Sequence, residues 1–172
     1  MTRNMNRKKI LYALLTAGML ISLFLLYEHF SVSAGKFCKF GENFDCGIVN
    51  KSPYANLDGI SYLLSVDFGL PLPFMDISSK SLILDLLTSN AFLGFLTLLF
   101  MLFLVNAKHS NKNFLWIKAN KTRKWLLGVS VFSVSYGFYL FLVQHFILRT
   151  YCIFCLILDV ILICVLFLAV KE

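Results

Sequence analysis

The sequence carries little charge and none of the common cofactor signatures. Only 15% of its 172 residues are charged, whereas 59% are hydrophobic, and the mean hydropathy is +0.77. This composition excludes an ordinary soluble globular domain. The sequence also has no internal repeat, no low-complexity tract, no glycine-rich phosphate loop, no nicotinamide or flavin fingerprint and no pair of haem ligands. Nothing in it therefore indicates nucleotide-dependent or haem-dependent chemistry.

The segments without charged residues are long apolar runs. Four of them reach the roughly 20 residues that an α-helix needs to cross a bilayer. We therefore expect an all-α integral membrane protein, a bundle of four transmembrane helices that forms one domain over residues 1–172. The expected spans are about residues 10–30, 82–105, 125–148 and 152–170. An outward loop is expected over residues 31–81.

The basic residues gather in two segments that contain no acidic residue. One segment precedes the first span and the other links the second span to the third. Their members are Arg3, Arg7, Lys8 and Lys9, then Lys108, Lys112, Lys118, Lys121, Arg123 and Lys124. Because lysine and arginine concentrate in cytoplasmic segments, we expect both termini to be cytoplasmic and the loop to face outward. The net charge of +7 thus reflects membrane topology, and we expect no nucleic-acid partner. The membrane is expected to be a plasma (inner) membrane, or the endoplasmic reticulum in a eukaryote.

The first apolar run has two interpretations. The small residues at 32–34 resemble a signal-peptide cleavage site, but the run is longer than the usual 7–15 residue signal core, which favours a retained helix. It ends at Tyr27-Glu28-His29-Phe30, a pattern typical of anchoring at the membrane interface. Glu28 and His29 could alternatively join a proton path.

Four of the five cysteines form two pairs on the expected outer side. Cys38 and Cys46 are eight residues apart and can close a small loop as a disulfide, a bond that persists in an oxidising compartment. Cys152 and Cys155 open the last span three residues apart, so their sulfur atoms share a helix face. The helix N-terminus favours the reactive thiolate. Together the pairs can relay electrons, although a purely structural staple would explain the loop pair alone.

The position of the second pair indicates the electron acceptor. A dithiol at the edge of the hydrocarbon points to a lipid-soluble acceptor, which means a quinone. Cys155 lies about 4.5 Å deeper than Cys152 by helical rise, so we expect Cys155 on the quinone side and Cys152 toward the loop pair. Asp159 shares this face and either carries protons or is satisfied by serines and tyrosines of the third span. Cys164 falls on the opposite face and is expected to be a buried packing residue.

Two polar residues are candidates for contact with a ligand as well as with the protein. Ser52 and Pro53 predict the start of a half-helix that continues to Leu64 and covers the outer mouth of the bundle. Ser52 can cap this helix or bond a ligand. Asn90 is expected about two and a half turns into the second span, where an unpaired amide is costly. It should bond either a neighbouring helix or a bound polar ligand.

Four features of the sequence occur together: Cys38-x7-Cys46, Ser52, Asn90 in Ser-Asn-Ala-Phe-Leu-Gly, and Cys152-Ile-Phe-Cys155. With this combination, the chain resembles the vitamin K epoxide reductase family over most of its length. The resemblance implies a four-helix bundle around a quinone of the menaquinone, ubiquinone or vitamin K type. It implies that a partner's thiolate attacks Cys38, and that Cys46 exchanges with Cys152. It further implies that Cys155 meets the quinone, whose polar groups are held by Ser52 and Asn90.

Two departures from the family pattern refine the expected function. Asp159 replaces a tyrosine of the animal members, which argues against epoxide reduction. The 172 residues leave no room for the fused thioredoxin-like domain of many bacterial members, so the redox partner should be a separate thioredoxin-fold protein. We expect a membrane thiol:quinone oxidoreductase that generates disulfides. The alternatives are a vitamin K epoxide reductase of the endoplasmic reticulum, a membrane protein that binds a soft metal, and a structural protein stapled by disulfides.

Overall fold

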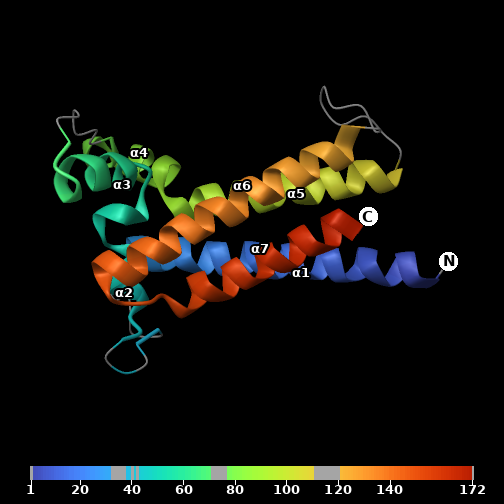
Figure 1. The fold of residues 1–172 in the computed structure, drawn as a ribbon, viewed down its shortest axis with the longest axis horizontal. Helices are drawn as coiled ribbons and strands as arrows, with labels where there is room; N and C mark the ends of the chain where they lie inside the picture. Colours follow the sequence, from blue (N-terminus) through green and yellow to red (C-terminus); the bar gives the residue numbers. More distant parts are fainter. Residues whose placement is uncertain are drawn as a thin grey trace.

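Four long helices run side by side along the longest axis of the molecule (Figure 1). The computed structural model describes residues 2–31, 38–39, 41, 43–70, 77–110 and 121–171. The long helices are α1 (Thr2–Phe30), α5 (Asn90–Ser110), α6 (Thr122–Leu142), extended by a π-helical segment (Val143–Leu148), and α7 (Ile153–Lys171). The short ones are α2 (Cys46–Asn50), a 3-10 turn (Pro53–Ala55), α3 (Asp58–Tyr62), a π-helical segment (Leu63–Asp67), a 3-10 turn (Ser78–Lys80) and α4 (Leu82–Thr88). The labelled short helices α2, α3 and α4 gather at the end opposite the two termini.

All four long helices are apolar enough to cross a membrane. The candidate spans are Asn6–Phe30, Asn90–Lys108, Thr122–Leu148 and Ile153–Lys171. Only 22–28% of the residues in the most apolar stretch of each helix are buried inside the bundle, so most of their apolar side chains face outward, as lipid contact requires. The structure thereby confirms the predicted all-α bundle with four transmembrane helices.

The apolar core lies between the four helices. Leu11 and Leu15 of α1, Met101 of α5, Leu126 of α6 and Val165 of α7 are all fully buried in one cluster. Helix α1 packs against α5 and α7, and α6 packs against the same two helices on the other side. Helix α1 thus supplies part of the core, whereas residues 32–34, which resemble a cleavage site, lie outside the described residues.

The prediction of one continuous helix over residues 82–105 is wrong. The chain breaks at Ser89, whose backbone is extended (φ −62°, ψ 133°), so that α4 lies outside the membrane span and α5 begins at Asn90. The Ser89 hydroxyl oxygen accepts from Phe92 N at 3.3 Å, which satisfies an amide in the first turn of α5. Asn90 therefore lies at the mouth of the bundle and not two and a half turns inside it.

The predicted half-helix from Ser52 to Leu64 is also interrupted. Asn56 is extended (φ −119°, ψ 167°) and pairs with Ser89, and Leu57 N donates to Thr88 O at 3.0 Å. These backbone contacts fix residues 52–64, called the covering segment below, to the junction of α4 and α5. Ser52 precedes Pro53 as predicted, but its hydroxyl makes no capping bond and donates instead to Val49 O at 2.7 Å.

Gly59 is required where the covering segment folds back on itself. A Cβ at this position would lie 2.6 Å from Tyr54 Cα and 3.1 Å from Pro53 O, both backbone atoms that cannot rotate away. We expect Gly59→Ala to displace the Pro53–Ala55 turn and to destabilise the fold by about 1–3 kcal/mol. Gly128→Ala is the control, because a Cβ there meets nothing within 4 Å. Equal thermal unfolding temperatures for the two purified variants would contradict this packing.

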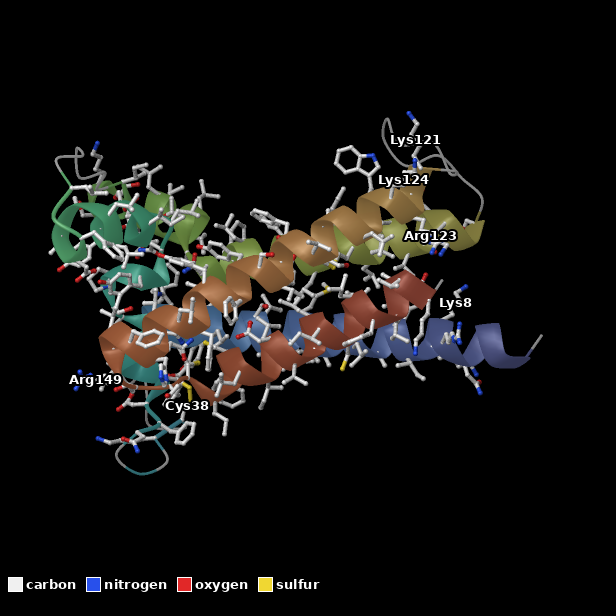
Figure 2. The ribbon with its side chains drawn as sticks, viewed as in Figure 1. Lys8, Cys38, Lys121, Arg123, Lys124 and Arg149 are labelled. Carbon is white, nitrogen blue, oxygen red and sulfur yellow. A yellow bond between two sulfur atoms is a disulfide. The ribbon has the colours of Figure 1, made fainter. Side chains whose placement is uncertain are left out.

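The charged residues separate to the two ends of the bundle as the sequence predicts. Figure 2 shows Lys8, Lys121, Arg123 and Lys124 at one end, and Cys38 and Arg149 at the other. At the basic end, Arg7 Nη1 donates to Lys171 O at 3.2 Å and Arg123 Nη2 to Val170 O at 3.1 Å. These bonds satisfy carbonyl groups at the end of α7. Lys112 and Lys118 lie outside the described residues.

Candidate functional site

The loop cysteines Cys38 and Cys46 are joined as a disulfide, with their Cα atoms 5.5 Å apart. Both residues are fully buried. Asp45 caps α2, because its carboxylate accepts from Gly47 N at 2.9 Å and Ile48 N at 3.2 Å. This cap makes Cys46 the first residue of α2 and fixes the direction in which it enters the helix.

Backbone hydrogen bonds hold the loop pair against the second pair. Asp45 N donates to Tyr151 O at 3.1 Å, and Tyr151 N donates to Asn43 O at 2.9 Å. Cys46 and Cys152 each directly follow one of these bonded residues. As a result, Cys152 is fully buried in the same cluster as both loop cysteines.

Cys152 and Cys155 have different surroundings. Cys152 directly precedes α7, and its Sγ accepts from Cys155 N at 3.2 Å, so it caps the helix. Gln144 Oε1 accepts from Cys152 N at 2.8 Å and ties this residue to the end of α6. Both are free thiols, but Cys155 is half-buried and lines a cavity, whereas Cys152 packs against the loop disulfide.

The cavity beside Cys155 has a volume of about 90 Å³. It is enclosed by the outer ends of α1, α6 and α7, by the start of α5 and by the covering segment. Besides Tyr54 and Cys155, its polar lining consists of His29, Asn50, Ser52, Asn90, Gln144 and Asp159. A second cavity of about 280 Å³ lies between α5, α6 and α7 and is mainly apolar. The two share four lining residues, Asn90, Leu140, Leu158 and Asp159, so they adjoin.

Asn90 ties three parts of the molecule together at the cavity. Its Nδ2 donates to Tyr54 O in the covering segment at 2.8 Å, and its Oδ1 accepts from Tyr136 OH on α6 at 2.8 Å. The amide retains one N–H and one lone pair for a ligand. Ser52 also lines the cavity, and because its hydroxyl proton points to Val49 O, its oxygen remains an acceptor.

Tyr54 closes the cavity from the covering segment. Its hydroxyl donates to the Asp67 carboxylate. Burial, with the hydrogen bond to Asp67 as the second cause, raises the pKa of Tyr54, so the phenol stays protonated at neutral pH. This bond ties the Pro53–Ala55 turn to the end of the Leu63–Asp67 segment.

Asp159 lines both cavities where α7 crosses α6. A Cβ on Gly137 would overlap the Asp159 carboxylate, so the glycine allows the close approach. In the described part of the chain no donor is hydrogen-bonded to this carboxylate. Ser133 of α6 instead donates to Val129 O at 2.8 Å. The expectation that α6 hydroxyls satisfy Asp159 is therefore not met by this structure.

Cys164 was expected to be buried, and this expectation is wrong, because the residue is exposed. Nine helical residues make about two and a half turns, which puts Cys164 on the face opposite Cys155, and this face points away from the bundle. Sequence reasoning also missed Asn50 and Tyr136 as cavity residues. The signal for Asn50 was its position at the end of the short helix that begins at Cys46. For Tyr136, nothing in the sequence indicates its bond to Asn90.

The described residues contain no cluster of three or more histidine, cysteine, aspartate or glutamate side chains that could hold a metal ion. The soft-metal alternative thus gains no geometric support from this part of the chain. The geometry instead supports thiol exchange at Cys152 and a ligand cavity at Cys155.

Comparison with known proteins agrees with this geometry. No curated protein sequence matches the chain significantly. The model of the vitamin K epoxide reductase family, in contrast, matches residues 9–170. That range includes both cysteine pairs, the cavity and nearly all of the four transmembrane helices. The chain belongs to the vitamin K epoxide reductase family and is an integral membrane oxidoreductase of disulfide and quinone chemistry.

Proposed function

We propose that this protein is a membrane thiol:quinone oxidoreductase that generates disulfides outside the cytoplasm. One observation supports it above all: Cys152 is packed with Cys46 and Cys38, while Cys155 lines the cavity. The dithiol therefore contacts a thiol donor through one sulfur and an electron acceptor through the other. In the overall reaction a partner dithiol and a quinone become a partner disulfide and a quinol.

The electrons pass through successive sulfur exchanges. A partner thiolate attacks Cys38, and Cys46 leaves as a thiolate. The partner's second thiol then attacks the mixed disulfide, which releases the partner as a disulfide and Cys38 as a thiolate. Cys46 attacks Cys152 of the oxidised second pair, and Cys155 leaves as a thiolate. Cys38 then attacks Cys46, which restores the loop disulfide and releases Cys152. The reduced second pair gives two electrons to the quinone and becomes a disulfide again. Because Cys38 is fully buried, the partner's attack requires the loop around it to shift.

The two adjoining cavities fit a quinone. Together they reach the roughly 300–1,000 Å³ typical of small-molecule sites. The remaining N–H of Asn90 can donate to a ring oxygen. Asn50 Nδ2 is buried and has no partner among the described residues, so it can donate too. The apolar cavity between α5, α6 and α7 suits a prenyl chain. When bound, the quinone serves as the two-electron oxidant, of the menaquinone, ubiquinone or vitamin K type.

The distribution of charge supports the orientation and the kind of partner. Cys38, which is clustered with the other three cysteines of the two pairs, lies at the end opposite Lys8, Lys121, Arg123 and Lys124. By the positive-inside rule, this arrangement supports a location of both pairs outside the cytoplasm. The partner is a separate thioredoxin-fold protein, and the membrane is a plasma (inner) membrane, or the endoplasmic reticulum in a eukaryote. Quinone is favoured over an epoxide because Asp159 replaces the tyrosine of animal members.

The function is tested on purified protein in detergent. Dithiothreitol is supplied as the reductant and a short-chain quinone as the oxidant, and the quinol is measured by absorbance. A lipid extract of the same protein is analysed for bound quinone. Turnover of quinone with a quinone in the extract supports the proposal. No turnover, together with a stoichiometric metal in the reduced protein, would favour the metal-binding alternative.

Asp159 is expected to hold a proton for the quinone at the boundary of the two cavities. Asp159→Asn keeps the side chain's size but removes this proton, so we expect quinone reduction to slow by about 10²-fold. Ser130→Ala is the control, because Ser130 is buried on α6 and lines neither cavity. If Asp159→Asn matches the wild-type rate at every pH tested, Asp159 is only a packing residue.

A further inference from the structure

His29 lies between the cavity and a second, polar hollow. It lines the cavity together with Cys155, and it also lines a hollow of about 430 Å³ at the outer end of the bundle. The exposed residues Lys51 and Pro53 line this hollow, so it reaches the surface. The His29 side chain is only 10% exposed, which does not fit the anchoring role that its position in the sequence suggests.

The two ring nitrogens of His29 have different partners. Nδ1 lies 2.6 Å from Asn50 O, and because a carbonyl oxygen can only accept, Nδ1 carries the hydrogen. Nε2 lies 3.2 Å from Asp85 Oδ1. The proton of this second bond can reside on either atom, as imidazolium with carboxylate or as imidazole with carboxylic acid. Asp85 can therefore pass a proton to Nε2, and His29 gives its Nδ1 proton to the cavity when the bond to Asn50 O breaks and the ring turns.

Asp85 is the outer member of the pair. Its side chain is 29% exposed, nearly three times the exposure of His29, and it lines only the hollow. Asn56 Nδ2 donates to the same Asp85 Oδ1 at 2.8 Å and fixes its orientation. The break at Ser89 separates α4 from the span and permits this placement of Asp85 beside the end of α1. Exposure thus falls from the hollow through Asp85 to His29.

Asn50 provides an independent sign that a polar ligand group binds at the inner end. Its carbonyl is held by His29, and the residue is 8% exposed and lines the cavity. Within the described part of the chain, its buried Nδ2 has no hydrogen-bond partner. An unpaired buried donor costs about 1–3 kcal/mol, so this position favours an acceptor such as a quinone oxygen. His29 therefore adjoins the place where a ring oxygen would need a proton.

Resting on the proposed function, we propose that His29, exchanging with Asp85, conducts protons from the outer hollow into the quinone cavity. The second cysteine pair gives up two electrons as its disulfide forms, and the two quinone oxygens take up two protons. Two protons leave the partner's thiols for the outer water as its disulfide forms, so the total balances. Only Cys155 of the second pair lines the cavity, so another proton route is needed. The other titratable groups around the route are Lys51, Asp58 and Tyr62 in the hollow, and Tyr54, Cys155 and Asp159 in the cavity.

The route is tested by reduction of a short-chain quinone with dithiothreitol, using the full chain in detergent. We expect His29→Gln to lower kcat by about 10²-fold with KM for the quinone unchanged. Added imidazole should restore part of the activity of His29→Gly. Asp85→Asn can still accept from Asn56 but cannot exchange a proton, so its kcat should also fall. His145→Gln is the control, because His145 lies at the same end of the bundle but lines neither the cavity beside Cys155 nor the polar hollow.

The outcomes separate this route from the proposed function. If His29→Gln and Asp85→Asn keep the wild-type kcat and solvent deuterium isotope effect while Cys155→Ala is inactive, the proton route is wrong and the proposed function stands. If kcat falls with a lower unfolding temperature and imidazole restores nothing, His29 is structural and the route is also wrong. If the wild-type protein reduces no quinone, both proposals fail.

Discussion

Replacing Cys155 with alanine is expected to abolish quinone reduction. Cys155 is the only residue of the second pair that lines the cavity, and no other described cysteine lines it. Loss of the group that reacts directly should lower the rate by on the order of 10³-fold or more. The measurement is absorbance of a short-chain quinone with dithiothreitol as the reductant.

Cys164→Ala is the matched control for this variant. Cys164 is on the same helix but is exposed on the opposite face, so its replacement should leave the rate unchanged. Cys155→Ala also cannot form the Cys152–Cys155 disulfide, so Cys152 should stay a free thiol when quinone is added. Equal quinone reduction by the two alanine variants would show that Cys155 does not face the acceptor.

Replacing Cys38 with serine is expected to separate the two half-reactions. The partner's thiolate must attack the loop disulfide, so Cys38→Ser should slow oxidation of a thioredoxin-fold protein by on the order of 10²-fold or more. A small thiol can reach the half-buried Cys155 through the cavity, so reduction of quinone by dithiothreitol should be spared. Both rates are measured on the same preparation.

The comparison of Cys38→Ser with Cys155→Ala tests the order of the relay. The first variant should lose only the reaction with the protein partner, and the second should lose both reactions. If the two variants lose both reactions to the same extent, the cysteines do not act in the order proposed here.

The general fold could be predicted from the sequence because lipid imposes strong constraints. Apolar runs of sufficient length must be helices, and basic segments mark one end. The break at Ser89 was not predicted, because residues 82–105 are apolar on both sides of it and hydropathy does not respond to a single extended residue. The Ser89-Asn90 pair was the available signal, since serine and asparagine side chains compete for local backbone bonds.

The site could be predicted only where the type of its residues and their spacing in the sequence indicate a known chemistry. The four cysteines follow from their intervals, and Ser52 and Asn90 from the family resemblance. The pairing of His29 with Asp85, in contrast, depends on how α4 folds back over the end of α1, which no local pattern encodes. Asn50 became a candidate only once its unpaired amide was located in the cavity wall.

The relay is tested most directly by alkylation of its four cysteines, read as a mobility shift on a gel. The purified protein is mixed with a reduced thioredoxin-fold protein, first without and then with quinone. The relay predicts that Cys38, Cys46, Cys152 and Cys155 are open to alkylation in samples taken before quinone is added and protected as disulfides in samples taken afterwards. Four cysteines that are protected in both samples, or open to alkylation in both, would contradict it.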